Sequence, residues 1–326
     1  MRAFSRFHQH LGVDSAEAVR TAPAILALAA GVLTALAKTA AAAATGSASM
    51  LATAMHSWVD TVTGCFLLAA YLAARRPADD RHPLGYGRGS YVWSLFASVA
   101  MVIVGVEVGF WRGIVQLGSA DTTTDYRLGY AIIAVSFVLE GLSFIQAVRF
   151  VRQRAAEFEV GVFAHVLNTS DAQLRVVFIE DFITLVGLAI AGLGMALHQI
   201  TGNAVYDATG SMLIGMLMGL AGLVLINVNR QYLVGMPLSA ERRAVALSLL
   251  RAIPEIRRVT FFFAEFIGPD RLLLAARVSL AGDHAQGELG RILRTLEQRI
   301  MAHKRVGQAF LSLAAPEEQD IDGRVS

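Results

Sequence analysis

Long apolar stretches fill the first two thirds of the chain and give way to a mixed pattern after about residue 235. A hydrocarbon core about 30 Å thick requires about 20 consecutive, mostly apolar residues per helix. The first stretch runs on into further spans and lacks a small-residue cleavage site, so we expect a retained helix and not a signal peptide. Six membrane-spanning helices are predicted, at roughly 23–44, 50–74, 91–112, 128–149, 173–197 and 205–228.

The pattern after Pro237 predicts a small soluble domain. Pro237 ends the last apolar helix, and Ser239 is a typical residue at the start of a new one. Periodicity then predicts a helix at 239–252, strands at 256–266 and 271–280, a helix at 285–303 and a strand at 306–313.

These elements together predict the fold class. We expect an α-helical integral membrane protein with six transmembrane helices, followed by a small cytoplasmic α+β domain of order αββαβ. The predicted parts are a cytoplasmic N-terminal segment (1–22), a six-helix transmembrane domain (23–230), the αββαβ domain (236–316) and a disordered tail (317–326).

The composition agrees with a membrane protein and excludes several classes. Of 326 residues, 55% are hydrophobic and only 17% are charged, which argues against a water-soluble enzyme. The formal net charge is +2, so no overall field attracts nucleic acid. Cys65 is the single cysteine, which rules out an intrachain disulfide and a metal site built from cysteine clusters.

The arginines predict the orientation, because short cytoplasmic loops carry an excess of Lys and Arg. Eleven arginines lie on one side of the predicted spans and two, Arg112 and Arg127, on the other. Both termini are therefore predicted to be cytoplasmic. The Arg-rich flanks, without an organellar presequence, indicate a bacterial inner membrane. The eleven are Arg2, Arg6, Arg20, Arg75, Arg76, Arg81, Arg88, Arg149, Arg152, Arg154 and Arg175.

Ionisable side chains within the spans are candidate functional residues, because a charge at membrane depth costs several kcal/mol. His56 and Asp60 in the second span are four residues apart and therefore project from one face of a helix. Imidazole and carboxylate are both good ligands for zinc. The full set is Lys38, His56, Asp60, Glu107, Glu140, Glu180 and Asp181.

The fifth span carries acids at a matching depth. Asp181 lies about eight residues from the cytoplasmic end of its span, or ~12 Å, and Asp60 about ten residues from the outer end of its own, or ~15 Å. In a core about 30 Å thick these depths meet within about one turn. A metal site shared between the second and fifth helices is therefore geometrically allowed.

Simpler interpretations remain open for each of these groups. His56 and Asp60 could be a hydrogen-bonded pair that fastens two helices. Glu140 could relay protons, hydrogen-bond to a metal ligand without binding the metal, or only form a hydrogen bond that packs two helices together. Glu107 and Lys38 lie nearer the outer ends of their spans, where extension toward water or mutual pairing would accommodate them.

Several segments together resemble the cation diffusion facilitator family. Lys38 and Thr45-Gly46-Ser47 also fit its pattern, as does the layout of six helices and a cytoplasmic αββαβ domain. Two further segments are similar to the branch that includes the mitochondrial zinc transporter and its bacterial relatives. The segments are Met55–Asp60, Arg81–Arg88 and Tyr91–Ser94, with Val177–Asp181 and Thr201–Asp207 for the branch.

The resemblance implies a homodimer that exchanges a divalent metal, usually zinc, for protons by alternating access. It also implies a site with two ligands each from the second and fifth helices, which maps onto His56, Asp60 and Asp181. One turn before Asp181 stands Val177, which cannot coordinate a metal. Glu180 is about 100° around the helix from Asp181, so its participation would need rotation or a bend. Glu180 could be the fourth ligand, a proton acceptor or a structural acid.

The sequence-based hypothesis is therefore a secondary transporter, not an enzyme, that exports Zn²⁺ from the cytoplasm in exchange for protons. His56 is the natural proton carrier because imidazole titrates near neutral pH, and it favours zinc or cobalt over manganese and magnesium. We expect as partners a divalent metal ion, protons, the lipid bilayer and a second copy of the chain, with no cofactor and no nucleic acid. Alternatives are efflux of Co²⁺, Fe²⁺, Mn²⁺ or Cd²⁺, a non-transporting membrane metal sensor, and a membrane acyltransferase with a His/Asp base.

Overall fold

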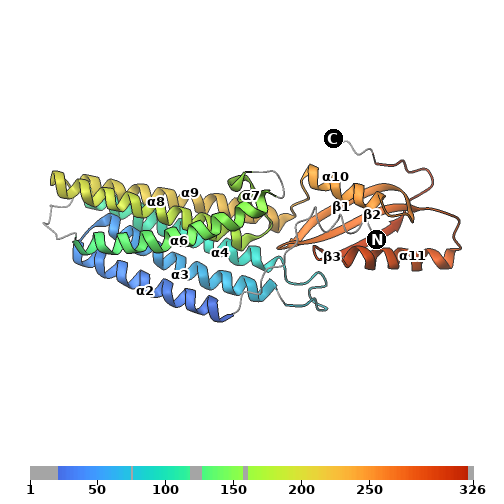
Figure 1. The fold of residues 1–326 in the computed structure, drawn as a ribbon, viewed down its shortest axis with the longest axis horizontal. Coiled ribbons are helices and arrows are strands. Elements are labelled where there is room, and N and C mark those ends of the chain that lie inside the picture. Colours follow the sequence, from blue (N-terminus) through green and yellow to red (C-terminus); the bar gives the residue numbers. More distant parts are fainter. Residues whose placement is uncertain (1–20, 75, 118–126, 157–160, 322–326) are drawn as a thin grey trace. The chain divides into compact units, whose positions relative to one another are not determined.

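The computed structural model describes residues 21–74, 76–117, 127–156 and 161–321 (Figure 1). The described chain divides into two compact units. One, the membrane unit, contains 21–72 and 90–230. The other, the sheet unit, contains 73–89 and 231–321. The predicted N-terminal segment lies, up to residue 20, outside the described residues.

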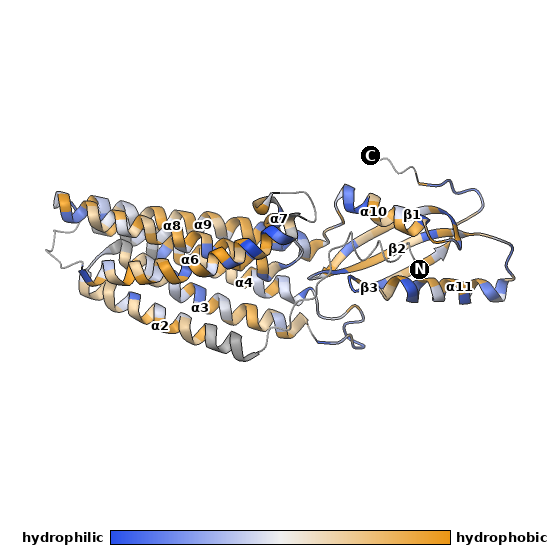
Figure 2. Ribbon diagram, viewed as in Figure 1, coloured by the Kyte–Doolittle hydropathy of each residue, from blue (hydrophilic) through white to orange (hydrophobic). Residues whose placement is uncertain are grey.

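Six helices in the described residues are long and apolar enough to cross a membrane, and Figure 2 shows apolar residues along all of them. The six spans and the mixed domain that follows them confirm the predicted fold class. The spans are formed by α2 (Thr21–Thr45), α3 (Ala48–Ala74), α4 (Gly89–Val104) with its continuation, α6 (Arg127–Ala156), α8 (Ala172–Thr201) and α9 (Val205–Val234).

The sequence predicted the third span as one helix, but the structure divides it into three parts. After α4 the chain forms a π-helix, η1 (Gly105–Trp111), and then a short helix α5 (Arg112–Leu117). The backbone of η1 lies against that of α9: a Cβ added at Gly109 would be 2.3 Å from the Gly215 Cα. Small residues permit such close helix contacts in membranes, and π-helices occur as local irregularities within α-helices. A further short helix, α7 (Val162–Asn168), lies between the fourth and fifth spans.

Burial distinguishes the fifth span from the fourth. In the hydropathic window of α8, 44% of the residues are buried inside the protein, whereas only 6% are buried in that of α6. α8 is therefore an inner helix, and α6 turns most of its apolar surface outward, as a lipid-facing helix would. The shared core of the unit includes Met50 of α3, Met101 of α4, and Leu188 and Met195 of α8.

Buried hydrogen bonds connect distant segments of the membrane unit. Ser47, in the turn between α2 and α3, donates to Asp207 of α9 over 2.8 Å, and both side chains are buried. These two residues belong to two of the segments that carry the family resemblance, so the structure connects those segments directly. At the other end of the helices, fully buried Arg175 donates to the Asn229 side chain over 2.9 Å.

The sheet unit has the predicted αββαβ order. It consists of α10 (Ala240–Arg251), β1 (Ile256–Gly268), β2 (Arg271–Leu280), α11 (Gln286–Met301) and β3 (Val306–Leu313). β1 and β2 form an antiparallel hairpin, and β2 and β3 pair in parallel through the α11 crossover. Asp270 adopts a left-handed conformation (φ 52°) in the hairpin turn. Both helices pack on one sheet face, around buried residues such as Phe262, Val278 and Leu296.

The segment after β3 corrects one prediction. Residues 317–321, which we had expected to be disordered, lie along β1. Thr260 donates to Glu318 over 2.6 Å, and Ile321 donates its backbone N–H to Val259 over 2.9 Å. The hydrogen bond from Thr260 holds the pKa of the Glu318 carboxyl below its usual range. Residues 322–326 lie outside the described residues.

The loop that follows α3 belongs to the sheet unit. Asp79 accepts a hydrogen bond from the Tyr86 hydroxyl over 2.8 Å, which lowers the Asp79 pKa. Arg88 forms an ion pair with Glu265 of β1 over 2.5 Å. A Cβ added at Gly87 would be 2.6 Å from the Ile267 carbonyl oxygen. The Arg81–Arg88 segment therefore forms a folded turn docked on β1, and its glycines permit that contact.

Candidate metal transport site

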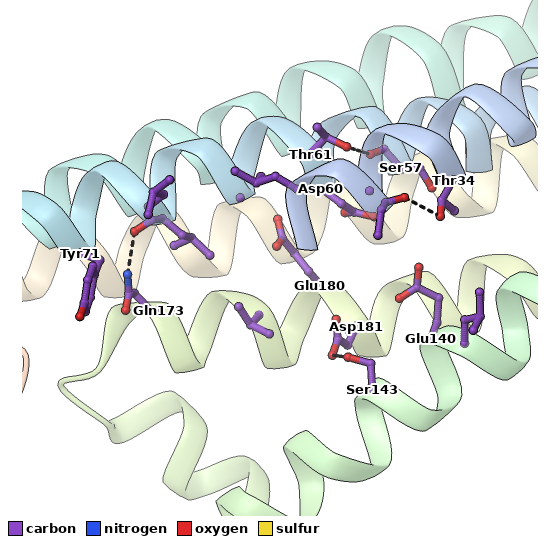
Figure 3. Close-up of a pocket in the computed structure, with 18 residues that line it drawn as sticks. Thr34, Ser57, Asp60, Thr61, Tyr71, Glu140, Ser143, Gln173, Glu180 and Asp181 are labelled. Carbon is purple, nitrogen blue, oxygen red and sulfur yellow. Dashed lines mark hydrogen bonds between the residues drawn. The ribbon is translucent and has the colours of Figure 1, made fainter. Parts of the chain in front are cut away.

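A cavity of about 640 Å³ lies within the membrane unit, between α2, α3, α6 and α8. Figure 3 shows the side chains that border it. Four carboxylates from three helices contribute to its lining: Asp60 of α3, Glu140 of α6, and Glu180 and Asp181 of α8. Because carboxylates at membrane depth are costly, four around one cavity indicate a site for cations.

The α3 part of the site is a buried pair. His56 Nε2 lies 3.2 Å from Asp60 Oδ1 on the same helix face, as the four-residue spacing predicted. The same nitrogen lies 3.2 Å from the Thr184 hydroxyl of α8. His56 is buried (1% exposed) and does not itself line the cavity, whereas Asp60 does. The pair therefore both joins two helices and presents a carboxylate to the cavity.

The α8 part of the site contains adjacent acids with different surroundings. Asp181 accepts a hydrogen bond from the Ser143 hydroxyl of α6 over 3.2 Å. Glu180 is buried (6% exposed), and its Oε1 has no hydrogen-bond partner among the described residues. Both side chains border the cavity although they lie about 100° apart around the helix. A buried carboxylate oxygen without a donor is unusual in a folded protein and is consistent with a place for a cation or a proton.

Val177 and Glu140 show how the fourth position differs from the expected pattern. Val177, one turn before Asp181, lines the cavity but has no ligand atom. Glu140 of α6 also lines the cavity, and Figure 3 shows its side chain beside α8, while Asp181 is turned toward Ser143. Glu140 is therefore, like Glu180, a candidate for the fourth metal ligand or for the proton acceptor.

The candidate ligands are neighbours, but they are not in coordinating positions. Within 21–74, 76–117, 127–156 and 161–321, no group of three or more His, Cys, Asp or Glu side chains is close enough to hold a metal ion. The structure brings Asp60, Glu180 and Asp181 to one cavity and places His56 against Asp60. The predicted ligand set of His56, Asp60, Glu180 and Asp181 remains a prediction.

The cavity occupies one half of the membrane helices. Along α3 its lining extends from Tyr71 back to Ser57, and along α8 from Gln173 to Asp181. The first third of α3, before Ser57, contributes no lining residue. Met50, Ala52 and Ala54 are buried there in the helix core. The site is therefore reached from the end of α3 that leads into the 75–89 loop.

Lys38 differs from its sequence-based interpretation. We had expected it to extend toward water or to pair with an acid, but its side chain is completely buried. Its ammonium donates to the Ser57 hydroxyl of α3 over 2.7 Å. Glu107, the other residue in that interpretation, is exposed on η1.

Sequence reasoning missed several polar cavity residues, among them Ser143 and Gln173. Ser143 lies three residues after Glu140, and this spacing alone would have placed both on one helix face. Gln173 donates to the Leu67 carbonyl oxygen over 2.7 Å and so joins α8 to α3. No short-range signal marks Gln173, because its partner is 106 residues away in the chain.

Comparison with known proteins identifies relatives that are named as metal transporters or metal tolerance proteins. The chain is 29% identical to the mitochondrial proton-coupled zinc antiporter SLC30A9 of Xenopus laevis over 73% of its own length and 43% of the relative's. It is 28% identical to metal tolerance protein C4 of Arabidopsis thaliana, over 72% of this chain and 51% of that one. With the zinc transporter ZitB of Escherichia coli it shares 24% identity over 82% of this chain and 79% of that one.

The chain thus spans less than half the length of the mitochondrial antiporters that it resembles. Residues 24–234 match the cation efflux transmembrane domain, which is more than half of the chain and includes all six spans and the whole cavity. The protein therefore belongs to the cation efflux, or cation diffusion facilitator, family of integral membrane proteins.

Proposed function

We propose that this protein is a secondary transporter that moves divalent metal ions, Zn²⁺ foremost, out of the cytoplasm in exchange for protons. The observation that carries the proposal is the cavity at membrane depth, bordered by four carboxylates and backed by the His56–Asp60 pair. Carboxylate oxygens and an imidazole nitrogen together form a ligand set suited to a borderline cation.

The preference for zinc rests on the imidazole. Manganese and magnesium favour all-oxygen shells, whereas zinc and cobalt accept nitrogen readily. In the present arrangement His56 Nε2 faces Asp60 and Thr184, so a ring movement would be needed to turn it toward a metal in the cavity. The names of two relatives include zinc, which supports the same preference.

Exchange for protons follows from the chemistry of the ligands. Carboxylates and imidazole bind a metal only when deprotonated, so metal entry releases protons and proton entry releases metal. Glu180 Oε1, buried without a hydrogen-bond donor among the described residues, is a suitable place for such a proton. One relative is named as a proton-coupled antiporter.

Alternating access is supported by the one-sided cavity. The site is reached from the end of α3 that leads into the 75–89 loop, while the opposite half is closed by packed residues and by the Ser47–Asp207 hydrogen bond. The arginine distribution favours a cytoplasmic position for that loop. The cavity then corresponds to an inward-facing state, and export would require a second state that opens the other half.

The remaining parts of the hypothesis are proposals of the same kind. The transporter would work in a bacterial inner membrane, with both termini cytoplasmic, as a homodimer without a resident cofactor. We propose no enzymatic reaction and no nucleic-acid partner.

The test is zinc flux into proteoliposomes that contain the purified full chain. An imposed pH gradient should drive uptake, and collapse of the gradient with a protonophore should abolish it. Zinc binding without flux would contradict transport and favour the membrane metal sensor. Equal flux with and without the gradient would contradict proton exchange.

A further inference from the structure

Lys38 places an amino group in the same membrane unit that contains the proposed cation site. It lies on α2, its side chain is completely buried, and an ammonium at such depth is costly. Its Nζ donates to Ser57 Oγ over 2.7 Å. Among the described residues it has no carboxylate within ion-pair distance, so no direct partner offsets the cost of its burial.

Its position relates it to the cavity. Ser57, the acceptor, is the cavity-lining residue of α3 furthest from the 75–89 loop, and it stands three residues before Asp60. The Lys38 nitrogen therefore lies one hydrogen bond away from a residue that lines the cavity. The carboxylates of Asp60 and Glu140 are within its electrostatic range.

A structural role does not require this charge. The next residue on each helix makes a parallel, neutral contact: Trp58 Nε1 of α3 donates to the Thr39 hydroxyl of α2 over 3.1 Å. This bond already fastens α2 to α3 at the same level. A neutral donor at position 38 could hold Ser57 equally well and would avoid the desolvation of an ammonium.

We propose that Lys38 is a fixed cation beside the transport cavity, positioned by Ser57, whose charge opposes that of the bound divalent ion and keeps its affinity low enough for release. The inference rests on the proposed transport function. Four carboxylates around one cavity would hold a divalent ion tightly, and a tightly held ion leaves slowly. A fixed positive charge weakens binding through space without occupying a ligand position, so Lys38 tunes the site and does not coordinate the metal.

The test compares three single variants in the full chain by equilibrium zinc binding in detergent and by zinc flux in proteoliposomes. Lys38→Gln keeps a donor for Ser57 but removes the charge, and it should bind zinc about 10- to 100-fold more tightly. Its maximal flux should fall together with its half-saturating concentration. Lys38→Arg, which keeps the charge, and Thr39→Val, which breaks only the neutral contact, should bind zinc like wild type.

A double variant separates the effect of the Lys38 charge from an effect on folding. In Lys38→Gln/Glu140→Gln one positive and one negative charge are removed together, and zinc affinity should return toward the wild-type value. A purely structural lysine predicts no such rescue.

Zinc affinity in Lys38→Gln equal to or weaker than that of a transporting wild type would overturn the inference and leave the transport function standing. A wild-type chain without metal flux would overturn both.

Discussion

The sheet unit and the membrane unit hold their charged side chains in different ways. In the sheet unit the carboxylates pair with arginines at the surface: Glu265 with Arg88, and Glu255 with Arg299 over 2.6 Å. In the membrane unit, among the described residues, none of the four cavity carboxylates forms an ion pair with Lys or Arg.

Surface pairs of the first kind contribute little to stability. Carboxylates gathered without such partners at membrane depth are costly and point to function. Conservative substitutions should therefore have small effects in the sheet unit and large effects in the cavity.

Removal of Asp60 should have the largest effect. Asp60→Ala deletes a cavity carboxylate and the partner of His56, so zinc flux should fall at least ~100-fold, beyond what the loss of a supporting residue costs. Proteoliposome flux measures this, and size-exclusion chromatography in detergent checks that the protein remains folded. Glu107→Gln, at an exposed acid outside the cavity, is the matched control and should transport normally. Near-normal flux in Asp60→Ala would remove Asp60 from the site.

His56→Asp should change the metal selectivity of transport more than the total metal flux. Replacement of the imidazole by a carboxylate makes the ligand set all-oxygen, so the ratio of zinc to manganese flux should fall by about an order of magnitude. Competition between the two metals in the flux assay measures the ratio. An unchanged ratio would show that His56 does not contribute to selectivity.

Glu180→Gln and Glu140→Gln should distinguish the two candidates for the fourth position. Each keeps the shape of the side chain and removes its charge. The residue that binds metal or proton should lose about 10- to 100-fold in zinc affinity or flux, whereas a packing residue should lose almost nothing. If both variants transport like wild type, the fourth ligand must be sought elsewhere.

Gly109→Ala should destabilise the membrane unit, whether or not metal is bound. Its Cβ would overlap the Gly215 backbone, and such overpacking costs about 1–3 kcal/mol. Thermal aggregation in detergent should begin at a lower temperature than in wild type. Gly202→Ala is not a suitable control because its φ is positive; Gly161→Ala is, because no atom lies within 4 Å of the added Cβ.

Glu318→Gln should have the smallest effect, and that effect should depend on pH. The folded-state pKa of Glu318 is lowered by Thr260 and Arg277, so the carboxylate stabilises the fold above its unfolded pKa of about 4.3 and loses this contribution as the pH falls through the folded pKa. At pH 7 the variant should show slightly faster hydrogen exchange in β1 than wild type. As the pH falls through the folded-state pKa the two proteins should converge. A constant difference across that range would contradict the assignment.

The parts of this protein that could be predicted from sequence are those with a short-range signal. Apolar length revealed the spans, alternation revealed the strands, and the four-residue spacing of His56 and Asp60 placed both on one face. Lys38 bonds to Ser57, 19 residues away, and the π-helix η1 lies against α9, about 100 residues further along the chain; neither contact leaves a local pattern. The order at 317–321 was missed because a polar tail that docks on a strand has the composition of one that does not.

The approach of η1 to α9 limits how this sequence can diverge. A Cβ at Gly109 would meet the Gly215 backbone, and a Cβ at Gly215 would lie 2.6 Å from the Phe110 nitrogen. The backbone at each glycine leaves no room for a side chain at the other. A substitution at either position alone therefore requires the two helices to move apart. Homologues that carry larger residues at these positions should differ at both together and should lack the π-helical turn.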